Sequence, residues 1–284
     1  MTAKQFQSVI LKWYAKNKRD YLPWRPKAKA KFFDPYKVLV SEVMLQQTQV
    51  ARVLQKFPEF LAAFPTIQDL ANAKLSKLLK VWQGMGYNRR ALYLQRTAQE
   101  IVKRFHGTIP QSVDDLLSLP GIGSYTAGAI ACFAYNEPVA FLDTNIRKVL
   151  LYHFFRGREK EAIKVSDKEI LGIAKKVLYK KNPREWHYAL MDYGALALSG
   201  QKGILQKTKG YRKQSSFLGS TRYFRSKIVR QLLETPYTTK IALFALIGQD
   251  KLFLSQTTPC EKILQGLLNE GLVEEDKKQR LYIP

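Results

Sequence analysis

Cysteine is scarce in this chain, and the shortage excludes two kinds of structure. Only two of the 284 residues are cysteines, Cys132 and Cys260. A disulfide framework or a cysteine-ligated metal site needs more thiols than these two residues supply. We therefore expect two reduced thiols and no metal site.

Long apolar runs are also missing. No stretch approaches the roughly 20 consecutive apolar residues that a membrane-spanning helix needs. The N-terminal segment is polar and lacks the apolar region of a signal peptide. These two absences predict a soluble intracellular protein with no membrane partner.

Acidic residues are few relative to basic ones. Asp and Glu number 23 against 47 Lys and Arg, which gives a formal net charge of +24. Such an excess favours a polyanionic partner, with nucleic acid as the first candidate and a membrane surface as the competitor. A hydrophobic content of 46% argues against disorder, and the chain is long enough for two domains.

The segment Leu116–Leu150 contains the clearest local pattern. Pro120 lacks a backbone donor, and Gly121 and Gly123 permit positive φ, so this stretch predicts a hairpin rather than a continuous helix. We expect Ser124 to cap the next helix. Exposed amides at such a hairpin can hold a phosphate, although an ordinary interhelical turn would have the same pattern.

Most of the remaining chain has helical spacing. The pattern predicts one long helix from the Asp34-Pro35-Tyr36 start through Phe57. It predicts further helices at Gln5–Lys16, Ile67–Leu79, Arg90–Phe105, Ser112–Leu117, Lys168–Tyr179, Glu185–Leu196, Ser226–Glu234, Thr239–Ile247 and Pro259–Asn269. Near the C-terminus, Gly271–Glu275 and Arg280–Ile283 alternate as two strands of a hairpin.

Glu42 is a candidate catalytic acid. It lies among Val40, Val43 and Met44, and burial would disfavour its charged form and raise its pKa. A surface glutamate that faces Arg52 or solvent would fit the same spacing. The residues around Glu42 leave both interpretations open.

Two polar segments are candidates for contact with nucleic acid. The run from Gln46 to Gln49 places four hydrogen-bonding side chains in succession, which is typical of a groove. The glycine-rich turn from Trp82 to Arg90 can present Tyr87 to a base and its arginines to phosphates, or Tyr87 can pack on the core. The basic run 26–31 fits a phosphate contact and a solvated linker equally well.

Seven ordered motifs carry a family resemblance. They are LPWR at 22–25, DPYKVLVSEVMLQQTQV at 34–50, FPTIQDLA at 64–71, WQGMGYNRRA at 82–91, LPGIGSYTAGAI at 119–130, LDTNIRKVL at 142–150 and ALMDYGALAL at 189–198. On these motifs the chain resembles the helix-hairpin-helix DNA glycosylases, most closely the MutY-type adenine DNA glycosylases. The resemblance spans roughly Phe6 to Leu198 and implies a mainly α fold with a two-lobed glycosylase core, which we place over 1–216. For 217–284 the helical spacing and the C-terminal hairpin predict a small winged-helix-like module.

The resemblance also implies catalytic roles. Glu42 matches the general acid that protonates adenine, and Asp143 matches the carboxylate that stabilises the oxocarbenium-like sugar. Tyr125 and Asn145 match residues that orient this site, and Arg25 matches an arginine of the catalytic pocket. Relatives that also cut the strand have a lysine at the position of Tyr125, so this chain is expected to be a monofunctional glycosylase.

Contacts with DNA are implied in the same way. The residues expected to touch DNA are Gln47, Thr48, Tyr87, Arg89, Gly121, Gly123, Lys207, Lys209 and Arg212. Gln47 and Tyr87 match residues that wedge beside the mispaired base. The hairpin at Gly121 and Gly123 matches a phosphate-binding element that a monovalent or divalent ion often assists.

One departure from the family concerns its four-iron four-sulfur cluster. The four cysteine positions are occupied here by Leu198, Leu205, Thr208 and Gln214, so we expect no cluster and no other cofactor. The corresponding loop, 198–216, is basic instead. Together with the start of the following module it contains Lys202, Lys207, Lys209, Arg212, Lys213, Arg222, Arg225, Lys227 and Arg230, for which we expect contacts with phosphate.

The other departures concern recognition of the base opposite adenine. Nothing after Phe217 resembles the Nudix-like domain with which the family usually recognises 8-oxoguanine. Three short helices and a hairpin there predict a winged-helix-like module that binds DNA or packs on the core. Thr144 and Asn88 also replace a glycine and an aromatic residue that are common in the family.

We therefore expect a monomeric enzyme of the cytoplasm or nucleoid that excises adenine opposite 8-oxoguanine or guanine in double-stranded DNA, within base excision repair. A mismatch thymine or uracil glycosylase on the same fold is one alternative. A DNA-binding descendant without catalysis is another. The presence of Glu42 in its motif favours the adenine glycosylase.

Overall fold

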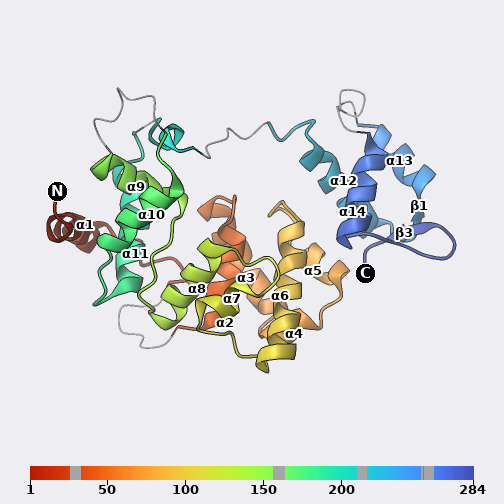
Figure 1. Cartoon of the computed structure of the whole chain (residues 1–284). Coiled ribbons are helices and arrows are strands. Elements are labelled where there is room, and N and C mark those ends of the chain that lie inside the picture. The colour runs from red at the N-terminus through yellow and green to blue at the C-terminus, as the bar shows by residue number, and fades with distance from the viewer. Residues whose placement is uncertain (26–32, 156–163, 202, 210–215, 251, 253–258) are drawn as a thin grey trace. The chain divides into compact units, whose positions relative to one another are not determined.

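The computed structural model describes residues 1–284 except 26–32, 156–163, 202, 210–215, 251 and 253–258 (Figure 1). The chain forms two compact units. The first unit comprises Met1–Glu42 and Ile109–Lys213, and the second comprises Val43–Thr108 and Gln214–Pro284. The predicted domain boundary after residue 216 lies close to the point where the chain returns to the second unit, and it stays a prediction.

The first unit is built from helices around an aromatic and aliphatic core. Its elements are α1 (Ala3–Asn17), the first part of α2 (Pro35–Leu45), α7 (Val113–Leu117), α8 (Ser124–Tyr135), α9 (Thr144–Phe154), α10 (Asp167–Lys176), α11 (Pro183–Asp192), the π-helix η2 (Tyr193–Ala197) and the 3-10 helix η3 (Ile204–Lys207). In the core, the ring of Phe6 packs edge-on against Phe154 and Trp186. Helix α1 is held at its start by a capping box between Thr2 and Gln5.

Helix α8 lies at the centre of the first unit because one of its faces is made of small residues. Ala127, Ala129 and Ala131 are fully buried. A Cβ on Gly128 would lie 3.0 Å from the Cβ of Phe141, so glycine allows that ring to approach the helix closely. The expectation that Ser124 caps this helix was wrong: Ser124 is its first residue, and Gly123 is the cap, without a side-chain hydrogen bond.

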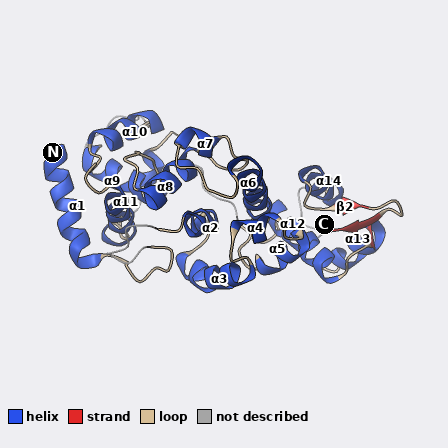
Figure 2. Cartoon of the chain, turned by 90° about the horizontal axis from the view of Figure 1, so that it is seen from below, coloured by secondary structure: helices blue, strands red, loops and turns tan. Residues whose placement is uncertain are grey.

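The second unit combines helices with the only strands among the described residues (Figure 2). Its elements are α3 (Val50–Ala63), α4 (Ile67–Ala71), α5 (Leu75–Val81), α6 (Arg89–Phe105), α12 (Thr221–Glu234), β1 (Thr238–Thr239), α13 (Lys240–Gly248), α14 (Cys260–Glu270), β2 (Glu274–Glu275) and β3 (Arg280–Tyr282). The end of α2 also belongs to this unit.

The long helix predicted through Phe57 is in fact two helices, α2 and α3. The chain breaks at Gln47, whose φ of 55° is left-handed. Partly buried Arg90 explains the break, because its Nη1 donates to the carbonyls of Val43 (2.9 Å), Met44 (3.0 Å) and Gln46. These carbonyls end α2 and need donors that a continuing helix would otherwise supply. Helix α3 also continues past Pro58 to Ala63.

The helix predicted over Ile67–Leu79 is likewise interrupted, giving α4 and α5. A capping box between Thr66 and Asp69 starts α4. Side chains of α6 satisfy the carbonyls at the break: Gln95 Nε2 donates to the carbonyl of Ala73 (2.6 Å), and Gln99 Nε2 to that of Ala71 (3.1 Å). These acceptors are bound by residues more than 20 positions later, which helical spacing does not predict.

The three helices and the hairpin predicted for the C-terminal segment are present, and the winged-helix-like domain stays a prediction. Helices α12, α13 and α14 are followed by an antiparallel hairpin of β2 and β3, and β1 pairs with the other edge of β3. The segment is attached to the earlier part of its unit, because Ser76 N donates to Pro284 O at 2.6 Å and Arg96 Nη2 to Glu270 O at 2.8 Å. Within the described part of the chain, no helix is both long and apolar enough to cross a membrane.

Replacing Arg90 by lysine should destabilise the protein. The two Nη atoms of Arg90 reach acceptors on the turn at Gln47 and on the turn at Tyr87, and the single ammonium group of a lysine cannot reach both sets. We therefore expect the free energy of unfolding to fall by about 2–3 kcal/mol. Chemical denaturation followed by circular dichroism measures it. Arg89→Lys is the matched control, since Arg89 is exposed, and should change stability by less than about 0.5 kcal/mol. Equal losses in the two variants would contradict this role of Arg90.

Candidate active site

Glu42 is buried in the first unit, which decides between the two interpretations that its sequence neighbours leave open. It lies on α2, its side chain is 5% exposed, and its Oε2 accepts a hydrogen bond of 2.5 Å from Tyr125 Oη. Burial raises the pKa of Glu42, the Tyr125 hydrogen bond opposes the rise, the charge of Asp143 adds to it and the charge of Arg25 opposes it, which brings the pKa to about 7. Glu42 is therefore a carboxyl group that can exchange a proton near neutral pH.

Tyr125 reaches Glu42 from the first turn of α8. Its ring packs edge-on against Phe141, with 5.7 Å between the centroids. Burial and the nearby carboxylates raise the pKa of Tyr125 well above its ordinary value of 10.0, so the phenol stays protonated and donates. On its other side Phe141 stacks at 4.1 Å on buried His187, whose pKa burial lowers to about 4. His187 is therefore a neutral support for this aromatic layer.

Asp143 is held at the N-terminus of α9. Its Oδ1 accepts from Ile146 N at 2.6 Å as the helix cap, and its Oδ2 accepts from Asn145 Nδ2 at 3.1 Å. Burial raises the pKa of Asp143, whereas these hydrogen bonds lower it. Asn145 is itself held closely, because a Cβ on Gly194 would lie 2.6 Å from Asn145 O.

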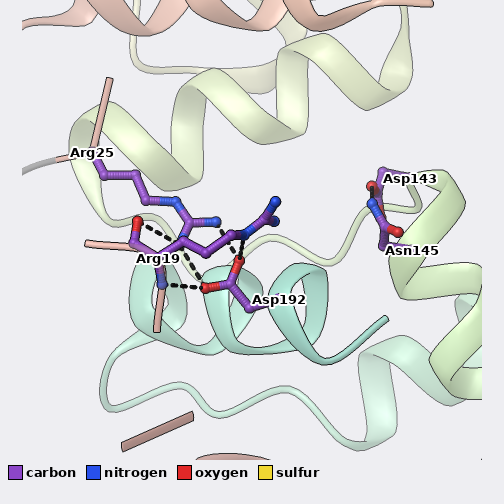
Figure 3. Close-up of polar contacts among 5 residues, drawn as sticks. All are labelled: Arg19, Arg25, Asp143, Asn145 and Asp192. Carbon is purple, nitrogen blue, oxygen red and sulfur yellow. Dashed lines mark hydrogen bonds and ion pairs between the residues drawn. The ribbon is translucent and has the colours of Figure 1, made fainter. Parts of the chain in front are cut away.

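Arg25 lies in a buried ion cluster beside Asp192. Its Nη1 and Nη2 donate to the two carboxylate oxygens of Asp192 at 2.8 and 2.7 Å, and Arg19 Nε donates to Asp192 Oδ1 at 2.7 Å. The Arg25 guanidinium also lies 4.4 Å from the centroid of the Tyr188 ring. Figure 3 shows this cluster apart from the Asp143–Asn145 pair. Arg25 thus acts on Glu42 through its charge, and Asp192 fixes where that charge lies.

The predicted hairpin joins α7 to α8. Gly121 has a φ of 79°, so only a residue without Cβ adopts this conformation without strain. Gly121 and Gly123 are exposed, whereas Ile122 between them is 7% exposed and anchors the turn. The backbone at the two glycines is open to a ligand, which is what phosphate binding requires.

Four residues expected to contact DNA lie in the second unit. Gln47 and Tyr87 are exposed and have left-handed φ of 55° and 48°, a strained conformation that often marks functional positions. Arg90 Nη2 donates to Met85 O (2.8 Å) and to Thr48 Oγ1 (3.0 Å), so it joins the turns that carry Gln47 and Tyr87. Arg89 is exposed and can reach a phosphate. Arg90, which was also expected to contact a phosphate, instead donates its hydrogen bonds to groups of the protein itself.

The basic residues after 198 are only partly within the described chain. Arg212 and the side chain of Lys207 lie outside the described residues, while Lys209 is exposed. Three later basic residues have partners from other parts of the second unit. Arg225 pairs with Glu270 (2.5 Å), Lys227 pairs with Asp250, and Arg222 Nη1 donates to Tyr87 Oη (2.6 Å).

The residues at the family's iron–sulfur positions do not fit such a cluster. Leu198 is 3% exposed, and Thr208, 4% exposed, donates from Oγ1 to Leu205 O at 2.7 Å. Leu198 O accepts from Lys148 Nζ, and Gln214 lies outside the described residues. Within the described part of the chain, no three His, Cys, Asp or Glu side chains form a group that could hold a metal ion. That the protein works without a cluster stays a prediction.

Sequence reasoning missed four residues that support these sites. Asp192 and Gly194 lie in the motif ALMDYGALAL. The acidic Asp192 beside the aromatic Tyr193 was the sequence signal that could have pointed to a functional position there. No sequence signal pointed to His187, because its role depends on stacking against Phe141, 46 positions earlier in the chain. Arg90 was assigned to phosphate because its bonds to the backbone are not visible in the sequence.

Glu42→Gln should stabilise the protein at neutral and alkaline pH. The pKa of Glu42 in the folded protein, about 7, lies above its ordinary value of 4.5. Its stabilising contribution is complete below about pH 4.5 and is lost as pH rises through about 7, a loss of about 3 kcal/mol by about pH 8. Chemical denaturation at several pH values compares the variant with the wild type. Exposed Glu59→Gln is the control, and a Glu42→Gln difference that does not grow between about pH 5 and 8 would contradict the assignment.

The sequence and the fold of this chain were both compared with those of known proteins, and both match DNA glycosylases of base excision repair. Residues 40–176 match the model of the HhH-GPD superfamily of base excision DNA repair proteins. The chain is 30% identical to an adenine DNA glycosylase of Mycobacterium tuberculosis, over 97% of this chain and 92% of that protein. It is 33% identical to one of Mycolicibacterium smegmatis, over 96% and 94%, and 37% identical to the human one, over 70% and 37%.

Solved structures agree on the fold. A thermostable thymine-DNA glycosylase matches with a TM-score of 0.62 and 26% identity, over 73% of this chain and 92% of that one. A non-covalent endonuclease III–DNA complex matches with a TM-score of 0.57 and 20% identity, over 74% and 96%. The chain belongs to the HhH-GPD superfamily of base excision DNA repair proteins and, within it, to the family of the adenine DNA glycosylases.

Proposed function

We propose that this protein is a monofunctional DNA glycosylase that hydrolyses the N-glycosidic bond of adenine mispaired with 8-oxoguanine or guanine. The observation that carries the proposal is the buried carboxyl of Glu42, with a pKa of about 7 and a hydrogen bond from Tyr125. Relatives that match it over more than nine-tenths of their length are adenine DNA glycosylases.

Glu42 supplies the proton that makes adenine a leaving group. Near neutral pH a substantial fraction of Glu42 is protonated, since its pKa is about 7. Proton transfer from Glu42 to a ring nitrogen of adenine lets the electron pair of the C1′–N9 bond move onto the base as that bond breaks. The carboxylate left on Glu42 keeps the hydrogen bond from Tyr125.

Asp143 stabilises the sugar that remains. The departing base leaves positive charge on C1′ and the ring oxygen, and the carboxylate of Asp143 is fixed by Ile146 N and by Asn145. Burial leaves the pKa of Asp143 above its ordinary value, but these hydrogen bonds oppose that rise and favour the ionised form. In the proposal the two carboxyl groups therefore divide the roles of acid and anion. Water then adds to C1′ and gives up a proton to the carboxylate of Glu42, so the products are adenine and an abasic site and Glu42 is protonated again.

Tyr125 limits the enzyme to base removal. A glycosylase that also cuts the strand uses an amine nucleophile to form a Schiff base with the sugar. A phenol with a raised pKa cannot do so. The strand should therefore stay intact after adenine leaves.

The substrate is double-stranded DNA, which suits the net charge of +24 and the exposed glycines of the hairpin. Gln47 and Tyr87 would fill the space beside the mispair, and Arg89 would contact phosphate. We further propose that the protein acts as a monomer at the nucleoid. Its loop at Leu198 would need no iron–sulfur cluster.

Single-turnover assays on duplexes with adenine opposite 8-oxoguanine, guanine, cytosine or thymine test this function. We expect adenine release opposite 8-oxoguanine and guanine, with strand cleavage only after alkali. Glu42→Gln should lower the rate constant by about 10²–10⁴-fold, while exposed Glu59→Gln should leave it unchanged. Full activity in Glu42→Gln would refute the mechanism.

A thymine or uracil mismatch glycosylase is the second candidate, because a thymine-DNA glycosylase shares the fold at 26% identity. Guanine–thymine and guanine–uracil duplexes in the same assay decide between the two. Release of thymine or uracil but not adenine would favour this candidate. Tight duplex binding with no base release would instead favour a DNA-binding protein without catalysis.

Adenine release should fall as pH rises, because only protonated Glu42 can donate. The alkaline limb of the single-turnover profile should have its midpoint at about pH 7. Tyr125→Phe removes a hydrogen bond that lowers the pKa of Glu42, so the limb should move to higher pH. Tyr135→Phe is the matched control on the same helix, since Tyr135 Oη donates to Ile109 O. A Tyr125→Phe limb that moves to lower pH would contradict the assignment.

A further inference from the structure

Three aromatic rings of the first unit pack on one side chain, Phe141. This residue lies between α8 and α9 and is 3% exposed. The rings of Tyr125 and Phe133 pack edge-on against it, with 5.7 and 5.6 Å between the centroids. His187 stacks on it at 4.1 Å, with an angle of 12° between the planes. Phe141 therefore joins side chains of α8 and α11, and one of them, Tyr125, donates to Glu42.

A second series of contacts leads from Phe141 to Arg25. Phe133 stacks on Tyr188 at 4.5 Å, with an angle of 9° between the planes. The guanidinium of Arg25 lies 4.4 Å from the centre of the Tyr188 ring, a cation–π contact. Asp192 also holds this guanidinium through two hydrogen bonds. The ring contact is therefore the weaker of these two supports of Arg25.

Both series of contacts end at a group that stabilises the anion of Glu42. The hydrogen bond from Tyr125 lowers the pKa of Glu42 against the effect of burial, and the charge of Arg25 does so as well. Asp143, at the start of α9, acts in the opposite direction. The positions of Tyr125 and Arg25 thus decide how far burial can raise this pKa.

Three other titratable groups beside these rings are uncharged at neutral pH. Burial raises the pKa of Cys132 on α8 and of Tyr188 on α11, and it lowers that of His187 to about 4. A displacement of Tyr125 or Arg25 is therefore not compensated by a charge on any of these three residues.

Close packing fixes the place of the Phe141 ring. A Cβ on Gly128 of α8 would lie 3.0 Å from the Cβ of Phe141 and 3.1 Å from its Cδ1. Carbon atoms in contact ordinarily lie about 3.5–4.0 Å apart, so only glycine leaves the ring where it is. Because His187 also stacks on the ring, Phe141 has little room to move.

We propose that Phe141 is a positioning residue for the general acid, Glu42. Its ring holds the Tyr125 hydroxyl at the carboxyl group and supports the rings on which Arg25 lies. The route through Tyr125 is the stronger one, because a hydrogen bond completes it. The inference deepens the proposed function, on which its catalytic meaning rests.

The direction of the change in pKa distinguishes a positioning role from simple filling of space. If Phe141 positions Tyr125, loss of its ring weakens the hydrogen bond to Glu42, and the pKa of Glu42 rises. If Phe141 only fills space, its loss lets water approach the buried carboxyl group. Water relieves the desolvation of the anion, and the pKa then falls.

An NMR titration of the Glu42 carboxyl carbon in the full chain measures this pKa, with Glu42→Gln to assign the signal. We expect Phe141→Leu to raise the pKa of Glu42 by about 1. Phe141→Met keeps more of the volume and should act in the same direction, even if the leucine variant is unstable. Phe6→Leu is the matched control, since Phe6 is a fully buried ring that packs on Phe154 and Trp186. It should lower stability and leave the pKa of Glu42 unchanged.

Gly128→Ala tests the position of the ring without removing it. The added methyl group has to displace Phe141, so the pKa of Glu42 should rise by about 0.5. Gly172→Ala is the matched control on helix α10, because a Cβ there would meet no atom within 4 Å. It should leave the pKa of Glu42 unchanged.

Combination with Tyr125→Phe tests the route of the effect. Phe141 acts mainly through the Tyr125 hydroxyl, so Phe141→Leu should raise the pKa of Glu42 by no more than about 0.3 once that hydroxyl is gone. Phe133→Leu alone should give a rise of the same small size, because it loosens only the support of Arg25.

Three results would overturn the proposal. A pKa of Glu42 that falls or stays the same in Phe141→Leu and Phe141→Met would mean that the ring only fills space. Equal rises with and without Tyr125→Phe would mean that the hydrogen bond is not involved. An equal rise in Phe6→Leu would mean a general loss of packing. The titration needs no DNA, so it is independent of the proposed function, which fails separately if the wild type releases no adenine.

Discussion

Burial of the Glu42 carboxyl is the constraint on which the first unit depends. The side chain loses water, which destabilises its anion and brings its pKa to about 7. The protein offsets part of this cost with the Tyr125 hydrogen bond. The support continues from Tyr125 through Phe141 to neutral His187, and Gly128 and Gly194 are small enough to let Phe141 and Asn145 approach. Packing around Glu42 therefore raises its pKa enough for this carboxyl group to donate a proton at neutral pH.

The second unit contains a partly buried charge of the opposite sign, that of Arg90, and its hydrogen-bonding groups are satisfied differently. Arg90 has backbone carbonyls and the Thr48 hydroxyl as partners, and its pKa is lowered by burial only to about 10, so it stays charged. It joins two turns whose tips, Gln47 and Tyr87, adopt left-handed backbone. A strained backbone conformation is kept only where neighbouring contacts hold it in place. Here the guanidinium of Arg90 supplies many of the contacts that hold the two turns.

The C-terminal segment belongs physically to the second unit. Arg222 Nη1 donates a hydrogen bond to Tyr87 Oη, and Arg96 Nη2 donates to Glu270 O at the end of α14. Ser76 N donates to Pro284 O. Mycobacterial relatives align over 97% and 96% of the chain, which includes this segment, whereas the human relative aligns over 70%. The C-terminal segment and the turn that carries Tyr87 therefore belong to one unit. In the described part of the loop after Leu198, Thr208 Oγ1 donates to Leu205 O, and Leu198 O accepts from Lys148 Nζ.

Local sequence patterns were enough to predict the helical class, the hairpin at Gly121, and the three helices and hairpin of the C-terminus, whereas for Glu42 they left a buried and a surface position open. These follow from local periodicity, turn chemistry and apolar neighbours, which act within a few residues. The break between α2 and α3, the pairing of Arg25 with Asp192 and the closeness of Gly194 to Asn145 instead arise from tertiary contacts. Each depends on a partner more than 40 residues away. Local spacing carries no information about which distant donor will satisfy a given carbonyl or carboxylate.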